Sequence, residues 1–325
     1  MAWKPLLWHG SLVLLVCALL AACSPSGQAE QLMAFAEHAR RDGQLTMAAE
    51  LYHRAAELQP HHFHTHYRTA LLYGQVENLN KAEEHLRKAL SLKPDFGPAH
   101  VHLGVVLLQR GYREDSRTEF LEALRCDARL PSAYYHLGLL TAHDGQLDAA
   151  AELFRKAISL NRHHQASYVR LGNLYVKQHR FADALDVLQR AMRLNPRDPT
   201  TFFNLGLAYE GLGKDTPAVA AFKQAIALNP AYASAHYNLG TLFLKRRAYQ
   251  TAVAPLKEAI RLNPQFSDAW YNLAAVYART GERMHAVQSL QRAIALSPAL
   301  ASEARKDDDF QSLHSEPDFF AMTAQ

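Results

Sequence analysis

The sequence lacks most features that mark disulfide-rich or nucleic-acid-binding proteins. It holds only three cysteines in 325 residues. Basic and acidic residues nearly balance, 35 Lys and Arg against 31 Asp and Glu, for a formal net charge of +4. A charge this small argues against nucleic acid as a partner. No low-complexity tract or long linker interrupts the body of the chain.

Sequence signatures of catalytic sites are absent as well. We find no GxGxxG, Walker A, GxSxG, HExxH, CxxC or CxxCH motif. No segment outside the repeated part described below is long enough to hold a catalytic domain. The sequence therefore predicts a non-enzymatic protein that uses no cofactor.

The apolar stretch near the N-terminus is short. Ser11 to Ala22 (SLVLLVCALLAA) follows Lys4 and is too short to span a bilayer comfortably. This order of one basic residue and a short apolar run is typical of a signal peptide. We therefore assign residues 1–22 as a signal peptide that is not part of the fold.

What the chain does have is an internal repeat of 34 residues. The unit is clearest in residues 199–232, which read as two amphipathic helices that meet at Gly213 and end at Pro230. The stripe of the first helix consists of Phe202, Leu205, Gly206 and Tyr209. The facing stripe of the second helix consists of Ala218, Phe222 and Ala225.

Steps of 34 residues in both directions place further units without insertion or deletion. Position 27 is alanine in every unit, and position 20 is always small. Position 8 is glycine in five units, which lets the two helices approach closely and gain dispersion contacts. Position 15 is also glycine in five units, where a left-handed residue can end the first helix. The units are residues 29–62, 63–96, 97–130, 131–164, 165–198, 199–232, 233–266 and 267–300.

This series of residues resembles the tetratricopeptide repeat (TPR). A single TPR hairpin cannot bury both of its apolar stripes, so neighbouring hairpins stack. The resemblance implies an all-α fold, a right-handed superhelical α-solenoid of eight TPR helix-turn-helix units over residues 29–300. We interpret residues 301–325 as a capping segment in which the acidic residues face water, with a partner-binding tail as the alternative. The side chains expected to cover the last hairpin are Phe310, Leu313, Phe319 and Phe320.

The end of the signal peptide, Leu20-Ala21-Ala22-Cys23, resembles the lipobox of bacterial lipoproteins. In that class the cysteine is diacylated and becomes the first residue of the mature protein. The resemblance implies lipidation of Cys23, a short linker over residues 23–28 and anchoring in the cell envelope. Ser24 after the cysteine resembles the class bound to the periplasmic face of the outer membrane. An uncleaved anchor or an ordinary secretory signal is the alternative.

Processing of this kind would leave one cysteine in the folded body. Cys17 would leave with the signal peptide and Cys23 would carry lipid, so no intramolecular disulfide is expected. Cys126 occupies position 30, which is leucine in every other unit. We interpret it as a small core hydrophobe rather than a nucleophile.

In TPR proteins the first helices line a concave groove, and positions 2, 5, 6, 9, 12 and 13 face the ligand. The resemblance therefore implies a groove with two halves. The predicted partner-binding residues of the N-terminal half are Tyr67, Arg68, His102, Tyr135, His136, Arg170 and Lys177. In the C-terminal half an asparagine ladder lies beside aromatic residues: Phe203, Asn204, Tyr237, Asn238, Tyr271 and Asn272. The simpler interpretation is that asparagine at position 6 belongs to the repeat consensus.

Histidine is unusually frequent, with 18 residues. The cluster HHFHTH, from His61 to His66, suggests a metal site. However, His66 occupies core position 4, so we favour packing and predict no metal site. Because imidazole titrates near 6.5, we also predict that His64, His102, His136 and His143 make an acidic ligand segment bind more tightly at pH 5.5 than at pH 8.

These observations predict a non-enzymatic scaffold whose groove binds an extended segment of a partner protein, and which a lipid anchors to the membrane. The first alternative is a structural lipoprotein of a secretion, pilus or exopolysaccharide assembly that acts through its convex surface. A histidine-dependent metal carrier is a remote second alternative. The expected partners are a protein or peptide and the membrane, without nucleic acid.

Overall fold

The computed structural model describes residues 24–323, and every regular element in this range is helical. Cys23, the predicted signal peptide and the last two residues lie outside the described range. The chain divides into two compact units, Met1–His164 and Gln165–Gln325, with the boundary at the end of the fourth predicted repeat. Each unit is described by itself. None of the described helices is both long and apolar enough to cross a membrane.

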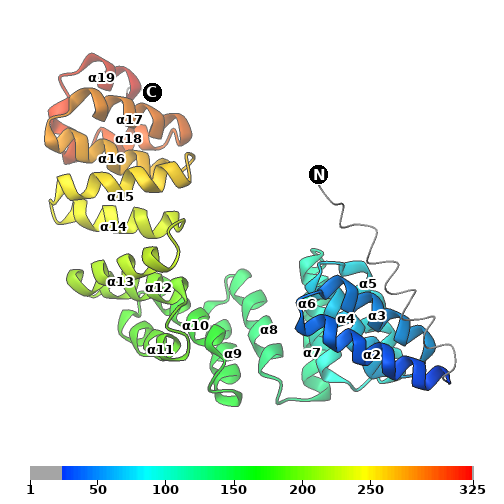
Figure 1. Cartoon of the computed structure of the whole chain (residues 1–325). Coiled ribbons are helices and arrows are strands. Elements are labelled where there is room, and N and C mark those ends of the chain that lie inside the picture. The colour runs from blue at the N-terminus through cyan, green and yellow to red at the C-terminus, as the bar shows by residue number, and fades with distance from the viewer. Residues whose placement is uncertain (1–23, 324–325) are drawn as a thin grey trace, which may run out of the picture. The chain divides into compact units, whose positions relative to one another are not determined.

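In the first unit, consecutive helices pack as pairs, one pair for each predicted repeat (Figure 1). The second helix of each pair also contacts the first helix of the next pair. The helices are α2 (Pro25–Arg41), α3 (Leu45–Leu58), α4 (Phe63–Gln75), α5 (Leu79–Leu92), α6 (Gly97–Gln109), α7 (Arg113–Cys126), α8 (Pro131–His143) and α9 (Leu147–Leu160).

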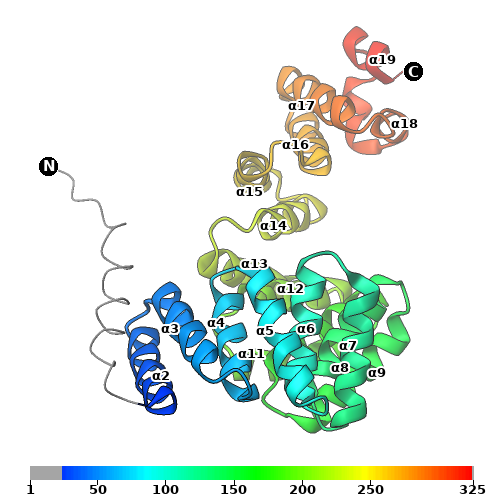
Figure 2. The ribbon, with the colours of Figure 1, turned by 90° about the vertical axis from the view of Figure 1, so that its right-hand side faces the viewer.

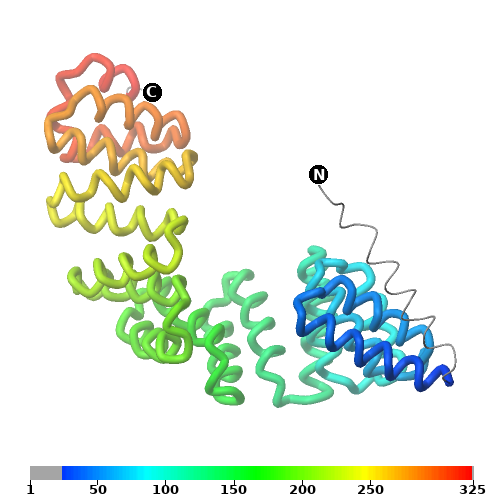
Figure 3. Tube along the Cα trace, viewed as in Figure 1, coloured from blue at the N-terminus to red at the C-terminus, as the bar shows by residue number. Residues whose placement is uncertain are grey.

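The second unit continues with pairs of the same kind, and Figure 3 shows each pair as one reversal of the chain. Its paired helices are α10 (Gln165–Lys177), α11 (Phe181–Leu194), α12 (Pro199–Gly211), α13 (Asp215–Leu228), α14 (Ala233–Lys245), α15 (Tyr249–Leu262), α16 (Ser267–Thr280) and α17 (Arg283–Leu296). The first helices begin at the predicted unit boundaries in every repeat except the first. The expectation of an all-helical TPR solenoid is therefore confirmed.

The first helix begins earlier than expected. Residues 23–28 were predicted to be a linker, but α2 already starts at Pro25. Ser24 caps it, because the Gly27 N–H donates to Ser24 Oγ at 3.3 Å. Proline suits the first helical position, where its missing N–H costs nothing. Residues 25–28 are thus part of the first hairpin rather than a linker.

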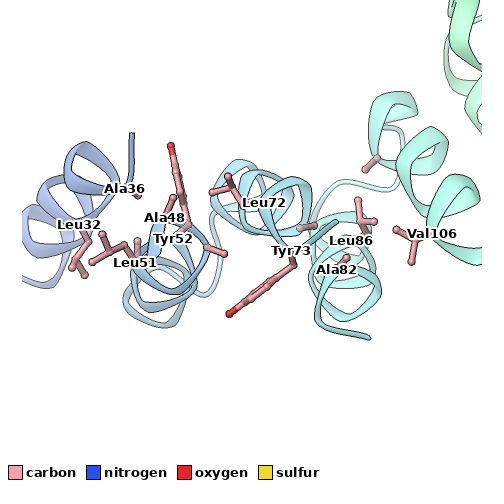
Figure 4. Packing of buried hydrophobic residues seen from close by; sticks show 14 of the residues in the cluster. Leu32, Ala36, Ala48, Leu51, Tyr52, Leu72, Tyr73, Ala82, Leu86 and Val106 are labelled. Atoms are coloured by element: carbon pink, nitrogen blue, oxygen red, sulfur yellow. The ribbon is translucent and has the colours of Figure 1, made fainter. Parts of the chain in front are cut away.

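Close approach of the paired helices explains the glycines at position 8. A Cβ atom added to Gly206 would lie 2.5 Å from Cε1 of Phe222, a ring that is fully buried. The alanines at positions 20 and 27 are completely buried as well. Figure 4 shows the resulting core in the first unit, where Leu32 and Leu51 point toward one another between α2 and α3.

The turn inside each hairpin requires a left-handed residue at position 15. All five glycines there have φ between 68° and 88°, as the sequence predicts. Glu77, His179 and Arg247 adopt the same conformation, with φ of 56–58°, although they carry a Cβ. The left-handed residue lets the following N–H reach back into the helix, as Asn78 N does to Tyr73 O at 2.9 Å. The hairpin therefore imposes this conformation even at a cost of roughly 1–2 kcal/mol.

The last hairpin is covered by α18 (Leu300–Ala304), the 3₁₀ helix η1 (Asp308–Leu313) and α19 (Pro317–Thr323). Figures 1 and 2 both show α18 and α19 lying against α17. Phe310, Leu313 and Phe319 are buried in one cluster with α16 and α17. Phe320, which we also expected to cover the hairpin, is instead 71% exposed. On a helix it points about 100° away from Phe319, so both rings cannot face the same surface.

Candidate functional site

The asparagine ladder of the second unit is partly occupied by bonds between neighbouring repeats. Asn204 Oδ1 accepts from Asn173 Nδ2 at 3.1 Å, and Asn204 Nδ2 donates to Thr200 O at 3.0 Å. Asn204 is only 1% exposed, so its predicted role in partner binding is wrong. Asn272 Nδ2 donates to Thr241 Oγ1 at 2.8 Å in the same way.

Position 6 of one repeat therefore bonds to position 9 of the repeat before it. The sequence analysis missed Asn173 and Thr241, although both occupy position 9 and carry polar side chains. Asn238 is the exception, since position 9 of the preceding repeat is Leu207, which cannot form a hydrogen bond. Asn238 Nδ2 instead donates to Ser234 O of its own helix at 2.8 Å. Asn238 and Asn272 remain partly exposed.

The aromatic residues at position 5 are half-buried against position 34 of the same repeat. The ring pairs, with their centroid separations, are Tyr67–Phe96 at 5.0 Å, Tyr135–His164 at 5.1 Å, Phe203–Tyr232 at 5.0 Å and Tyr237–Phe266 at 4.5 Å. Burial raises the pKa of Tyr67 and of Tyr237. Each ring thus packs on the loop that leads to the next repeat, and only its remaining surface is open to a ligand.

Tyr271 is held differently, because its repeat is the last. Its ring lies 5.1 Å from Phe310, and its hydroxyl donates to Asp307 Oδ2 at 2.8 Å. Burial, and then the Asp307 carboxylate that accepts its hydrogen bond, raise the pKa of Tyr271 strongly. The C-terminal segment thus takes the place of position 34 for this ring.

The predicted basic residues are divided between the two units. Arg68 is exposed on α4, and its Nη1 donates to Glu37 Oε1 at 3.3 Å and to the Tyr52 hydroxyl at 3.1 Å. These residues line a cavity of about 440 Å³ together with Met33 and His64. Arg170 and Lys177 are exposed on α10 of the second unit. Because Glu37 already pairs with Arg68, the surface around Arg68 is less basic than the sequence suggests.

Three of the four histidines behind the predicted pH dependence of this half have a lowered pKa, which disfavours their charged form. Burial lowers the pKa of His64 and of His102. His136 stacks on Phe120 at 5.1 Å, and burial followed by the charges of His102 and His164 lowers its pKa to about 4. His136 is therefore neutral at pH 5.5 and does not attract an acidic segment there, whereas the contribution of exposed His143 stays a prediction.

Histidines at position 4 have a shared structural role. Their ring N–H donates to the carbonyl of the proline at position 32 of the preceding repeat. The pairs are His66 with Pro60 at 3.1 Å, His100 with Pro94 at 2.9 Å and His236 with Pro230 at 3.0 Å. Trp270 Nε1 makes the same bond to Pro264 at 3.1 Å. Any ring with an N–H at this point can join two repeats.

No group of three or more histidine, cysteine, aspartate or glutamate side chains in residues 24–323 has an arrangement that could hold a metal ion. His61 and His62 are exposed, whereas His66 is buried. Cys126 is partly buried, with its Sγ 3.8 Å from Pro94 O.

Comparison with known protein families matches this architecture. Four family models, each described as tetratricopeptide repeat, match residues 63–96, 102–164 with 216–265, 171–237 and 256–288. The chain is a tetratricopeptide repeat protein. Proteins of this family are generally non-enzymatic scaffolds for protein–protein interaction. The matched ranges contain most of the predicted groove residues, from Tyr67 to Asn272.

Solved structures of TPR proteins are similar in fold. The Cut9–Hcn1 hetero-tetramer of the APC/C matches with a TM-score of 0.61 and 20% identity, over 78% of this chain and 50% of that one. PilF of Pseudomonas aeruginosa matches with a TM-score of 0.59 and 22% identity, over 69% of this chain and 98% of that one. Among curated proteins, DnaJ homolog subfamily C member 3 of Mus musculus is 26% identical over 105 residues, which is 32% of this chain. The chain spans about a fifth of that relative's length.

Proposed function

We propose that this TPR protein is a non-enzymatic scaffold that binds an extended segment of a partner protein on the first helices of its second unit. The observation that carries the proposal is Asn238, whose amide is partly exposed and not linked to the neighbouring repeat. Tyr237 and Phe203 lie on the same row of helices and keep part of their rings exposed. An amide carries both a donor and an acceptor, so it can pair with a peptide backbone.

Photo-crosslinking in the native host tests this proposal. A photoreactive amino acid at position 238 should give a crosslinked partner protein, and the same amino acid at position 121 should give none. Leu121 is a matched control, since it is 54% exposed but lies on α7, a second helix. Crosslinks only from position 121 would instead support the structural lipoprotein that acts through its convex surface.

Asn238→Ala should weaken binding of the captured partner about three- to tenfold, since one net hydrogen bond contributes ~0.5–1.5 kcal/mol. Its melting temperature should stay unchanged. Asn204→Ala is the contrasting control: it removes a buried side chain and leaves partly buried Asn173 without its acceptor, so it should cost about 1–3 kcal/mol of stability. Affinity measurements and thermal melting of both variants check this. Unchanged affinity of a folded Asn238→Ala protein would contradict the proposed site.

We further propose that Cys23 is diacylated and anchors the protein in the cell envelope, on the periplasmic face of the outer membrane. The resemblance of residues 20–23 to a lipobox supports this. Cys23→Ser should abolish acyl labelling and move the protein from the membrane to the soluble fraction. If the variant stays membrane-bound with residues 1–22 intact, the segment is an uncleaved anchor. A protein at this envelope location would not encounter nucleic acid as a partner.

A further inference from the structure

Three histidines from three helices form a continuous hydrogen-bonded chain between the first two repeats. His53 on α3 and His66 on α4 both contact His85 on α5. His53 Nδ1 lies 2.9 Å from His85 Nε2, and His66 Nδ1 lies 3.0 Å from His85 Nδ1. His85 is 1% exposed and His66 is 4% exposed, so little water reaches either ring.

The bond from His66 to Pro60 determines where every proton of the neutral chain lies. A carbonyl oxygen only accepts, so His66 must carry its proton on Nε2. Its Nδ1 then accepts, and His85 Nδ1–H must donate. His85 Nε2 accepts in turn, and His53 Nδ1–H must donate. His53 Nε2 is left with a lone pair that faces Glu57 Oε1 at 3.9 Å.

This arrangement has room for one additional proton and no more. A proton added at His53 Nε2 faces the Glu57 carboxylate and leaves both imidazole–imidazole bonds intact. A second added proton must enter one of the two gaps between rings. It would place two N–H groups against each other within about 3 Å. That hydrogen bond would then be lost in a buried site.

We propose that the chain His53–His85–His66 is an acid-sensitive latch, which holds α3, α4 and α5 together at neutral pH and releases them when a second proton enters it. The latch is independent of partner binding. Release of α4 would also displace Tyr67 and Arg68, which α4 carries next to His66.

The other charged groups around the chain do not offset the burial of a second proton, because Lys88 lowers the pKa of His85 and of His66 more than Glu84 raises it. Glu57 is bound by Arg54, and Glu84 is bound by Lys88 at 2.7 Å. Tyr73 lies with its ring 5.9 Å from both His53 and His85, and its hydroxyl contacts Glu50 and Lys81. A cavity of about 380 Å³, lined by the three histidines, lets protons reach the chain from solvent.

The direction of the pH effect follows from the titration of the buried rings. Burial, and then the charges of His66 and His53, lower the pKa of His85 to about 3, and burial also lowers the pKa of His66. A histidine whose folded pKa is depressed stabilises the fold above ~6.5, the value of free imidazole, and this contribution is lost as pH falls. The latch should therefore weaken progressively below about pH 6.5.

The next repeat provides a built-in control with the opposite sign. His100 occupies the same position as His66, but Glu119 replaces the second histidine, and His100 Nδ1 lies 2.7 Å from Glu119 Oε2. The Glu119 carboxylate, which accepts that bond, raises the pKa of His100 despite burial. A raised pKa stabilises the fold below ~6.5 and this contribution is lost as pH rises. A carboxylate at position 23 thus favours the charged form of the histidine at position 4.

Hydrogen exchange of the full-length protein between pH 7.5 and 4.5, corrected for the intrinsic exchange rate, tests the latch. Opening of residues 45–92 should become about ten- to one hundredfold more frequent per pH unit below pH 6, because one or two protons bind only after opening. Residues 97–126 should show a smaller loss, because the raised pKa of His100 opposes the lowered pKa of buried His102. In the His85→Glu variant this loss of protection at low pH should disappear, because the new carboxylate accepts hydrogen bonds from protonated His53 and protonated His66. Protection of residues 45–92 that does not change with pH, or the same loss in His85→Glu, would overturn the proposal.

A second measurement needs no variant. Ring ¹⁵N chemical shifts at pH 7.5 should show His66 as the Nε2–H tautomer and His85 as the Nδ1–H tautomer. His85 should stay neutral at pH 5.5. The opposite tautomer of His85, or a charged His85 at pH 5.5, would also overturn the latch.

Discussion

Gly206→Val is expected to lower the free energy of unfolding by about 3 kcal/mol or more. A Cβ at this position would meet three ring atoms of Phe222 at 2.5–2.9 Å, well inside ordinary contact distance. Phe222 is completely buried, so its ring has no free space into which to move. Overpacking of a dense core costs ~1–3 kcal/mol, and the branched valine adds two further methyl groups. Chemical denaturation of the full-length protein measures the loss.

Gly74→Ala is the matched control. Gly74 also lies in a first helix, α4, but a Cβ added there has no heavy atom within 4 Å. Alanine should therefore be neutral or stabilise the protein by up to about 0.5 kcal/mol, because it restricts the unfolded chain. If Gly206→Val unfolds at the same denaturant concentration as the wild type, the close approach of α12 and α13 does not limit this core.

Phe310→Ala is expected to destabilise the second unit by about 3–5 kcal/mol, the usual cost of removing a buried phenylalanine side chain. The ring is completely buried and packs against Tyr271 and Phe319. Deletion of residues 301–325 should cost more. It also removes Asp307 from the Tyr271 hydroxyl and Ser312 from Ala278 O. Thermal melting and light scattering of both variants measure stability and aggregation.

Phe320→Ala is the control for this segment. Phe320 is the same residue type in the same segment but is 71% exposed. Its replacement should change stability by less than about 0.5 kcal/mol. Equal melting of Phe310→Ala and the wild type would show that the C-terminal segment does not stabilise the last hairpin.

Most of the repeat architecture could be predicted from the sequence, because each unit is a local structure. The 34-residue register predicts where the first helices begin, from Phe63 to Ser267. Glycine at position 8 predicts the close approach of two helices that are adjacent in the chain. The turns at Glu77, His179 and Arg247 follow the repeat in the same way, although residue type alone does not favour them.

The candidate site was predicted less well, because its side chains bond across repeats. Position within the unit indicates which face of a helix a residue occupies, but not which residue lies opposite it in the next repeat. Asn204 bonds to Asn173 and is buried, whereas the residue at the corresponding position before Asn238 is Leu207 and Asn238 remains partly exposed. The histidines at position 4 differ instead by a contact inside the repeat, because His66 meets His85 whereas His100 meets Glu119.

The sequence by itself therefore determined the helices, their pairing and the repeat family, since these depend on contacts within one unit of 34 residues. The tertiary structure alone decided which polar groups remain free and which protons each histidine holds. Those properties depend on burial and on partners 19–32 residues away in the chain. A repeat consensus describes each unit separately, and the physical chemistry of this protein's surface lies in the contacts between units.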